Sequence, residues 1–76
     1  MRSAVQLQHA LGEEIRRLRQ ARVLTQEALA HDSGIHTNAL GRLERGESDS
    51  RVVTLFKVAI GLKMPLEEII AGVKRR

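Results

Sequence analysis

Three side chains between positions 37 and 42 have the chemistry to form hydrogen bonds with the edges of nucleic-acid bases. With about 100° between consecutive residues of a helix, Thr37, Asn38 and Arg42 lie on one side. Leu40 and Leu43 lie on the other side and would anchor the helix to a core. Arginine can donate two hydrogen bonds to guanine O6 and N7, asparagine pairs with adenine N6 and N7, and threonine offers a hydroxyl and a methyl group. The spacing therefore predicts a helix suited to the major groove of DNA.

Gly41 lies on the same side as these polar residues. A glycine inside a helix costs about 1 kcal/mol relative to alanine. Close approach of another surface, such as DNA, would explain the glycine, and so would chance. The alternative interpretation of the whole face is the solvated side of an ordinary amphipathic helix. The geometry by itself favours neither interpretation.

The elements that must position this helix are also helical, because apolar residues recur at helical spacing and no long stretch alternates as a strand would. Ser3 would cap the start of the first helix. Glu13 and Arg17 are spaced to pair across one turn of its outer side. The core side of this helix would carry Leu7, Leu11, Ile15 and Leu18.

Residues that favour helix ends divide the rest of the chain into four further helices. Threonine and serine cap helix starts, glycine takes the left-handed conformation at helix ends, and proline suits a first helical position. The third and fourth helices would cover residues 37–44 and 51–61. In chain order, the end markers are Thr25, Gly34, Gly46, Ser50 and Pro65. We expect an all-α, compact five-helix domain in which the second and third helices are joined by a tight turn.

Size and composition exclude several classes of protein. The 76 residues suffice for one domain, 1–76. Cysteine is absent, so neither a disulfide nor a thiolate metal site is available, and Phe56 is the only aromatic residue. No apolar run approaches the length of a membrane span, and the N-terminal segment is too polar for a signal peptide. We expect a cytoplasmic protein without a membrane partner.

The charge balance favours an anionic partner. Thirteen Lys and Arg residues outnumber nine Asp and Glu residues, which gives a formal net charge of +4, and ten of the thirteen are arginines. The planar guanidinium suits phosphates and guanine edges better than the lysine ammonium does. A basic surface attracts nucleic acid first and an acidic membrane second. A charge of +4 is also ordinary for a soluble domain, so it supports the DNA hypothesis only weakly.

Motifs from Leu11 to Leu66 resemble the Cro-and-repressor type, or lambda-repressor-like, helix-turn-helix family. The matching segments are LGEEIRRLRQAR, LTQEALAHDSGI, LGRLERGES and TLFKVAIGLKM. The Thr-Gln helix start, Leu-Ala, Gly-Ile and Leu-Glu-Arg-Gly are specific at these spacings. The resemblance implies a sequence-specific transcriptional regulator that binds a palindromic operator in double-stranded DNA, with residues 37–44 in the major groove.

The resemblance also implies roles for individual residues. Gln26, at the start of the second helix, matches a phosphate contact, which free N–H groups at a helix start favour. Arg45 would meet phosphate where the chain leaves the groove. Arg19 and Glu44 match a partly buried salt bridge between the first and third helices. The positions at or near base edges are His36, Thr37, Asn38, Gly41 and Arg42.

Two features depart from the family pattern. His36 stands where the family often has a serine that caps the recognition helix. Histidine caps poorly, so either the helix start is looser or His36 itself touches a phosphate or a base. The connection after the third helix is acidic, with Glu47 and Asp49. These carboxylates weaken the case for this connection lying on the DNA backbone.

The fourth helix carries more apolar surface than one core stripe needs. Leu55, Val58, Ala59 and Leu62 share one side, and Val53, Phe56 and Ile60 share another, more than about 100° away. Exposed apolar patches usually mark partner surfaces. A two-fold homodimer interface is therefore predicted, made of Val53, Phe56, Ile60, Ile70 and Val73. The alternative is that the fifth helix folds back and covers this face within one chain.

Other functions have less support. His9, His31 and His36 do not form a recognised metal spacing, and no phosphate-binding loop or nucleophile elbow is present, so neither an enzyme, a cofactor, a metal nor a small-molecule ligand is expected. The main rival is an antitoxin of the same family, whose chief partner is a toxin protein. The short ends of the chain favour a regulator. Its size also resembles the controller proteins of restriction–modification systems.

Overall fold

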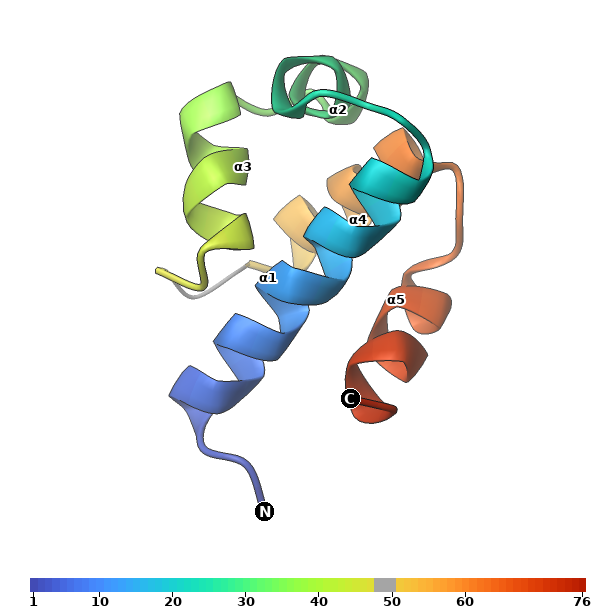
Figure 1. Ribbon diagram of the computed structural model, residues 1–76. Coiled ribbons are helices and arrows are strands. Elements are labelled where there is room, and N and C mark those ends of the chain that lie inside the picture. The colour runs from blue at the N-terminus through green and yellow to red at the C-terminus, as the bar shows by residue number, and fades with distance from the viewer. Residues whose placement is uncertain (48–50) are drawn as a thin grey trace.

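The computed structural model describes residues 1–47 and 51–76, and these fold into five α-helices (Figure 1). The helices are α1 (Ala4–Ala21), α2 (Gln26–Ser33), α3 (Thr37–Glu44), α4 (Val52–Leu62) and α5 (Leu66–Lys74). The predicted all-α, five-helix class is confirmed. The bounds differ in detail, because α4 begins and ends one residue later than predicted and Pro65 is the N-cap of α5 instead of its first helical residue. The predicted Ser50 cap lies outside the described residues.

Local sequence accounts for the start of α1 and for both ends of α2. The Ser3 hydroxyl accepts a hydrogen bond from the Gln6 backbone N–H, and the Gln6 side chain accepts one from the Ser3 N–H, which is a capping box. The Thr25 hydroxyl caps α2 by accepting from the Ala28 N–H at 3.0 Å. Gly34 ends α2 in the left-handed conformation, with φ of 70°. The short turn that follows leads directly into α3.

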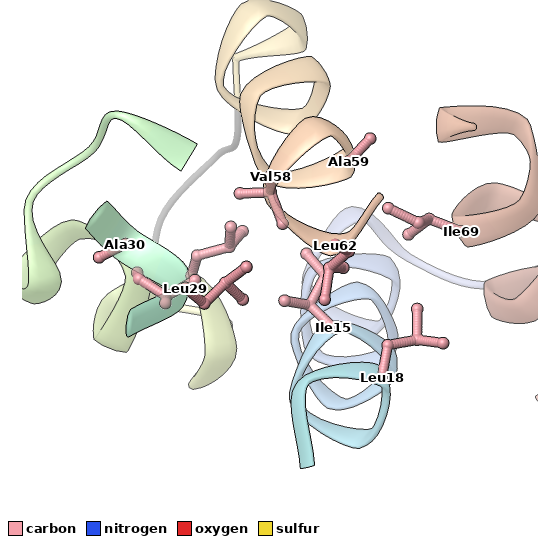
Figure 2. Packing of buried hydrophobic residues seen from close by; sticks show 10 residues of the cluster. Ile15, Leu18, Leu29, Ala30, Val58, Ala59, Leu62 and Ile69 are labelled. Atoms are coloured by element: carbon pink, nitrogen blue, oxygen red, sulfur yellow. The ribbon is translucent and has the colours of Figure 1, made fainter. Parts of the chain in front are cut away.

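Helix α1 crosses the molecule, with α3 on one side of it and α5 on the other, while α2 lies across α4 (Figure 1). Side chains from α1, α2 and α4 meet between these helices (Figure 2). The core is aliphatic, and Phe56 lies outside it; its buried members are Ile15, Leu18, Leu29, Ala30, Leu40, Leu43, Val58, Ala59, Leu62 and Ile69. None of the helices in the described ranges combines the length and hydropathy of a membrane span.

A buried carboxylate joins α1 to α5. The Glu14 side chain lies against Gly72, and its oxygens accept hydrogen bonds from Arg17 at 2.7 Å and from Arg76 at 3.1 Å. The bond from Arg17 lowers the pKa of the Glu14 carboxyl, whereas burial opposes this by raising it. The predicted pairing of Glu13 with Arg17 is therefore wrong, because Arg17 turns to the buried carboxylate. Glu13 pairs with Arg76 instead, at 3.0 Å.

Gly12 sets the distance between α1 and α3. A Cβ atom at this position would lie 2.5 Å from the Glu44 carbonyl oxygen and closer still to that of Leu43. Both obstacles are backbone atoms of the last turn of α3, so they cannot rotate away as a side chain would. Only glycine allows α1 to approach α3 this closely.

An ion pair holds the same two helices together. Arg19 of α1 donates to Glu44 of α3 twice, from Nε to Oε2 at 2.7 Å and from Nη2 to Oε1 at 3.0 Å. Its third nitrogen, Nη1, donates to the Leu24 carbonyl oxygen at 2.8 Å. The exposed fractions of the two side chains are 11% and 3%, and the bond from Arg19 to Glu44 raises the pKa of the guanidinium. The pair expected from the sequence is present, and it is shielded from water.

Replacing Gly12 with alanine is expected to lower the free energy of unfolding by about 1–3 kcal/mol, because the new methyl group forces α1 away from α3. This loss should appear even though alanine favours a helix by about 1 kcal/mol over glycine. Gly41→Ala is the matched control, since a Cβ there meets only side-chain atoms, 3.2 Å from Arg45 Nη1 and 3.7 Å from Gln26 Oε1. Urea unfolding measures both; equal stability of the two variants would contradict the account.

Arg19→Met should destabilise the fold by about 3–5 kcal/mol, because the variant leaves the Glu44 carboxylate buried without its cation. Arg45→Met is the control, since it removes an equally well-formed but exposed pair with Glu47, whose loss should change the stability little. Adding Glu44→Leu to Arg19→Met should recover much of the loss. Thermal unfolding followed by circular dichroism tests all three. Similar losses for Arg19→Met and Arg45→Met would show that the buried pair has no special importance.

Candidate nucleic-acid interface

Helix α3 has one anchored side and one open side. Leu40 and Leu43 are buried in the core, whereas Asn38 and Arg42 are exposed. The helix begins after His36, whose side chain makes no capping hydrogen bond to the backbone of α3. The polar side predicted from the spacing is therefore the side that α3 presents outward.

The open side of α3 and the start of α2 form a shallow recess. Its volume is about 480 Å³. The recess brings together six of the seven residues expected to contact DNA, and His36 stands outside it at the start of α3. Gly41 is its floor, since a Cβ there would lie between Arg45 and Gln26. The lining residues are Gln26, Thr37, Asn38, Gly41, Arg42 and Arg45.

Gln26 is held in place by the buried ion pair. Its Nε2 donates to Glu44 Oε1 at 3.0 Å, so the Glu44 carboxylate binds both Arg19 of α1 and Gln26 of α2. One N–H of the amide and its oxygen remain free of this bond. The family resemblance indicated Gln26 only as a phosphate contact and did not indicate its link to Glu44. Nothing in the local spacing indicates this link, because positions 26 and 44 lie on different helices.

The two arginines of the recess differ in their partners. Arg45 pairs with Glu47, from Nε to Oε2 at 2.6 Å and from Nη2 to Oε1 at 3.4 Å. This bond raises the pKa of Arg45 and lowers that of Glu47. Arg42 forms no ion pair with the residues that the structure describes. Among the described residues, the Arg42 guanidinium is therefore the less occupied of the two.

A second surface, on α4 and α5, is apolar and exposed. The exposed fractions are 65% for Val53, 53% for Phe56, 70% for Ile60 and 37% for Ile70. Helix α5 therefore leaves this face uncovered, contrary to the alternative in which it folds back over it. Val52, 63% exposed, belongs to the same surface and was not predicted. It precedes Phe56 by four residues, and this helical spacing would have indicated it.

Val73 does not belong to this apolar surface. Only 7% of it is exposed, because it follows Ile69 by four residues and shares the inward side of α5. Its inclusion among the interface residues is therefore corrected. The surface instead continues into a groove of about 520 Å³ between α4 and α5. Phe56 and Ile70 line this groove, together with Leu66, Glu67, Ala71 and Lys74.

No cluster of three or more His, Cys, Asp or Glu side chains suited to a metal occurs within residues 1–47 and 51–76. The polar recess on α3 and the apolar surface on α4 and α5 are thus the two features that need a functional explanation.

Known proteins with similar sequences share the helix-turn-helix. A helix-turn-helix family model matches residues 15–69, close to the 11–66 expected from the motifs. The HTH-type transcriptional regulator SutR of Escherichia coli K12 is 38% identical over 61 residues, which are 80% of this chain and 34% of SutR. This chain therefore spans about a third of the length of SutR.

Solved structures agree with the family match. The restriction-modification controller protein C.AhdI from Aeromonas hydrophila is 34% identical, with a TM-score of 0.79 over 80% of this chain and 92% of that one. The clp gene regulator ClgR from Corynebacterium glutamicum is 26% identical, with a TM-score of 0.85 over 91% of this chain and 90% of ClgR. These relatives are described as regulators, in agreement with the expected absence of enzyme activity. The chain belongs to the Cro/C1-type helix-turn-helix family of DNA-binding transcription regulators and has its lambda-repressor-like fold.

Proposed function

We propose that this protein regulates transcription by binding a palindromic operator as a homodimer, with α3 of each protomer in the major groove. The observation that carries the proposal is the recess on α3, which gathers six candidate contact residues on an anchored helix. Residues 1–76 would act as one DNA-binding domain. Its place of action would be the cytoplasm, where it meets the DNA.

The exposed side of α3 would make the contacts with bases. The Arg42 guanidinium, exposed and without an ion pair among the described residues, suits guanine O6 and N7. Asn38, one turn before it, suits adenine, and Thr37 at the start of α3 suits a thymine methyl group. Because Gly41 lacks a side chain, the bases and backbone of DNA can approach α3 closely. These contacts would provide the sequence preference.

Residues at the edges of the recess would make the contacts with phosphates. Gln26 is the first residue of α2, where free backbone N–H groups and the helix dipole favour an anion. Its amide keeps one donor free after its bond with Glu44, so it can donate to a phosphate while remaining fixed. Arg45 and His36 flank the two ends of α3 and would meet phosphate on either side. Together these residues would hold α3 in register along the groove.

The apolar surface on α4 and α5 supports a two-fold dimer. A single α3 offers few base contacts, and two copies related by two-fold symmetry would place their recognition helices about 34 Å apart, one turn of DNA. Phe56 of one protomer would pack near the groove beside the partner's α5. C.AhdI, a restriction-modification controller, and SutR, a transcriptional regulator, support a regulatory role for a domain of this kind.

An antitoxin is the second candidate, because the same exposed apolar surface would serve a toxin protein as well as a second copy. Such a protein keeps its DNA-binding face, so the two candidates differ in what covers α4. The oligomeric state of the purified chain separates them, since a toxin-binding surface needs no self-association.

Arg42→Ala should weaken binding to a selected operator by about 1–3 kcal/mol and relax the preference at one base pair. Random DNA should be affected less, because phosphates dominate that binding. Fluorescence anisotropy at fixed salt measures both. Arg75→Ala removes the same charge at the end of α5, on the other side of α1 from α3, and should change the preference little (Figure 1). Equal loss on operator and random DNA would exclude a base contact by Arg42.

Phe56→Asp should convert a dimer to a monomer, because it places a charge in the centre of the proposed apolar interface. Analytical ultracentrifugation at micromolar concentration measures this, and circular dichroism checks that the variant is folded. Lys57→Asp is the control, since Lys57 is exposed on α4 about 100° away from Phe56 and should leave the dimer intact. A wild-type protein that is already monomeric at micromolar concentration would contradict the dimer.

A further inference from the structure

The acidic residue that follows α3 is placed by the backbone. Gly46 ends the helix in the left-handed conformation, with φ of 68°. The Gly46 N–H donates to the Leu43 carbonyl oxygen at 3.1 Å, and the Glu47 N–H donates to that of Arg42 at 3.0 Å. Gly46 also lies directly against His9 of α1, where a Cβ would not fit. The turn thus fixes the position of Glu47, and its carboxylate lies beside Arg45.

Glu47 occupies one edge of the Arg45 guanidinium and leaves the other edge free. The bonds to Glu47 use Nε and Nη2. The remaining nitrogen, Nη1, lies over Gly41, 3.2 Å from where a Cβ would be, and so faces the recess. The Arg45–Glu47 pair has a defined geometry, but about half of each side chain is exposed, 58% for Arg45 and 50% for Glu47. It can therefore be opened at little cost by a competing anion.

A phosphate and a carboxylate compete for the same donors of an arginine. Glu47 also lies within the electrostatic reach of Arg42, which contributes to lowering the pKa of Glu47 and keeps it charged. The acidic side chain therefore reduces the positive field of the recess as a whole. Binding to random DNA rests almost entirely on phosphate contacts. A weaker positive field therefore lowers the affinity for random DNA more than the affinity for an operator.

We propose that Glu47 is a specificity-determining residue, which restrains Arg45 so that the recess discriminates against random DNA. In a complex seated on its operator, Nη1 of Arg45 can reach a phosphate while the pair with Glu47 stays closed. On random DNA, a contact through the whole guanidinium requires that the pair open. This inference rests on the proposed DNA-binding function and adds the residue that limits unspecific binding.

The test is to measure Glu47→Gln binding to operator and random DNA over a range of salt concentrations. For random DNA, the slope of log K against log salt should steepen by about 0.9 per protomer, so that the affinity gain over wild type grows roughly eightfold between 1 M and 0.1 M salt. Operator binding should change less, so that the ratio of the two affinities falls. Glu68→Gln, on the exposed side of α5, removes the same charge and should leave the slope unchanged.

A double-variant cycle shows whether the effect passes through Arg45. In an Arg45→Ala background, Glu47→Gln should steepen the slope much less, because only its weaker interaction with Arg42 remains. An unchanged slope for Glu47→Gln alone, an equal gain on operator and random DNA, or a full effect without Arg45 would each overturn the inference. Failure of the proposed function is distinguishable, because wild-type protein would then show no sequence preference at all.

Discussion

The carboxylate of Glu44 is the point on which the position of the recognition helix depends. It lies at the end of α3, almost fully buried, and it accepts hydrogen bonds from Arg19 of α1 and Gln26 of α2. A buried charge is stable only if it keeps its partners, so α3 cannot shift without breaking these bonds. Gly12 acts with it by letting the backbones of α1 and α3 touch. A recess built on such an anchor can present its side chains in a fixed geometry, as contact with base edges requires.

The recess on α3 and the surface on α4 and α5 differ in their chemistry. The recess on α3 is polar and basic, and its candidate contacts are spaced for hydrogen bonds. The surface on α4 and α5 is apolar, and Phe56, Val53 and Ile60 are exposed on it. A small aliphatic core leaves little stability to spare, so a domain of this size gains from association. Self-association would also supply the second recognition helix, so stability and selectivity would depend on the same face.

Local patterns made much of this fold predictable, because helix ends and helix sides depend on neighbours in sequence. Thr25 and Gly34 mark the ends of α2, and the spacing of Leu40 and Leu43 defines which side of α3 is buried. Contacts between helices were harder to predict from the sequence. The bond of Gln26 to Glu44 and the burial of Val73 depend on which helix lies opposite. Arg17 pairs with Glu14 of its own helix, α1, whose carboxylate is covered by α5. Gly12 looked like an ordinary helical residue until α3 was in place against it. Helical spacing indicated four of the seven candidate contact residues, and the family resemblance added Gln26, His36 and Arg45. The structure supplied their geometry.

Selecting bound fragments from a random pool of double-stranded DNA with the wild-type protein would show how many recognition helices bind and at what spacing. We predict a two-fold symmetric consensus whose half-sites are centred about 34–36 Å, or 10–10.5 base pairs, apart, or a multiple of that spacing. The most constrained positions should lie within each half-site, where α3 would enter the groove. A pool that yields no consensus, or one with a single unpaired half-site, would contradict the account.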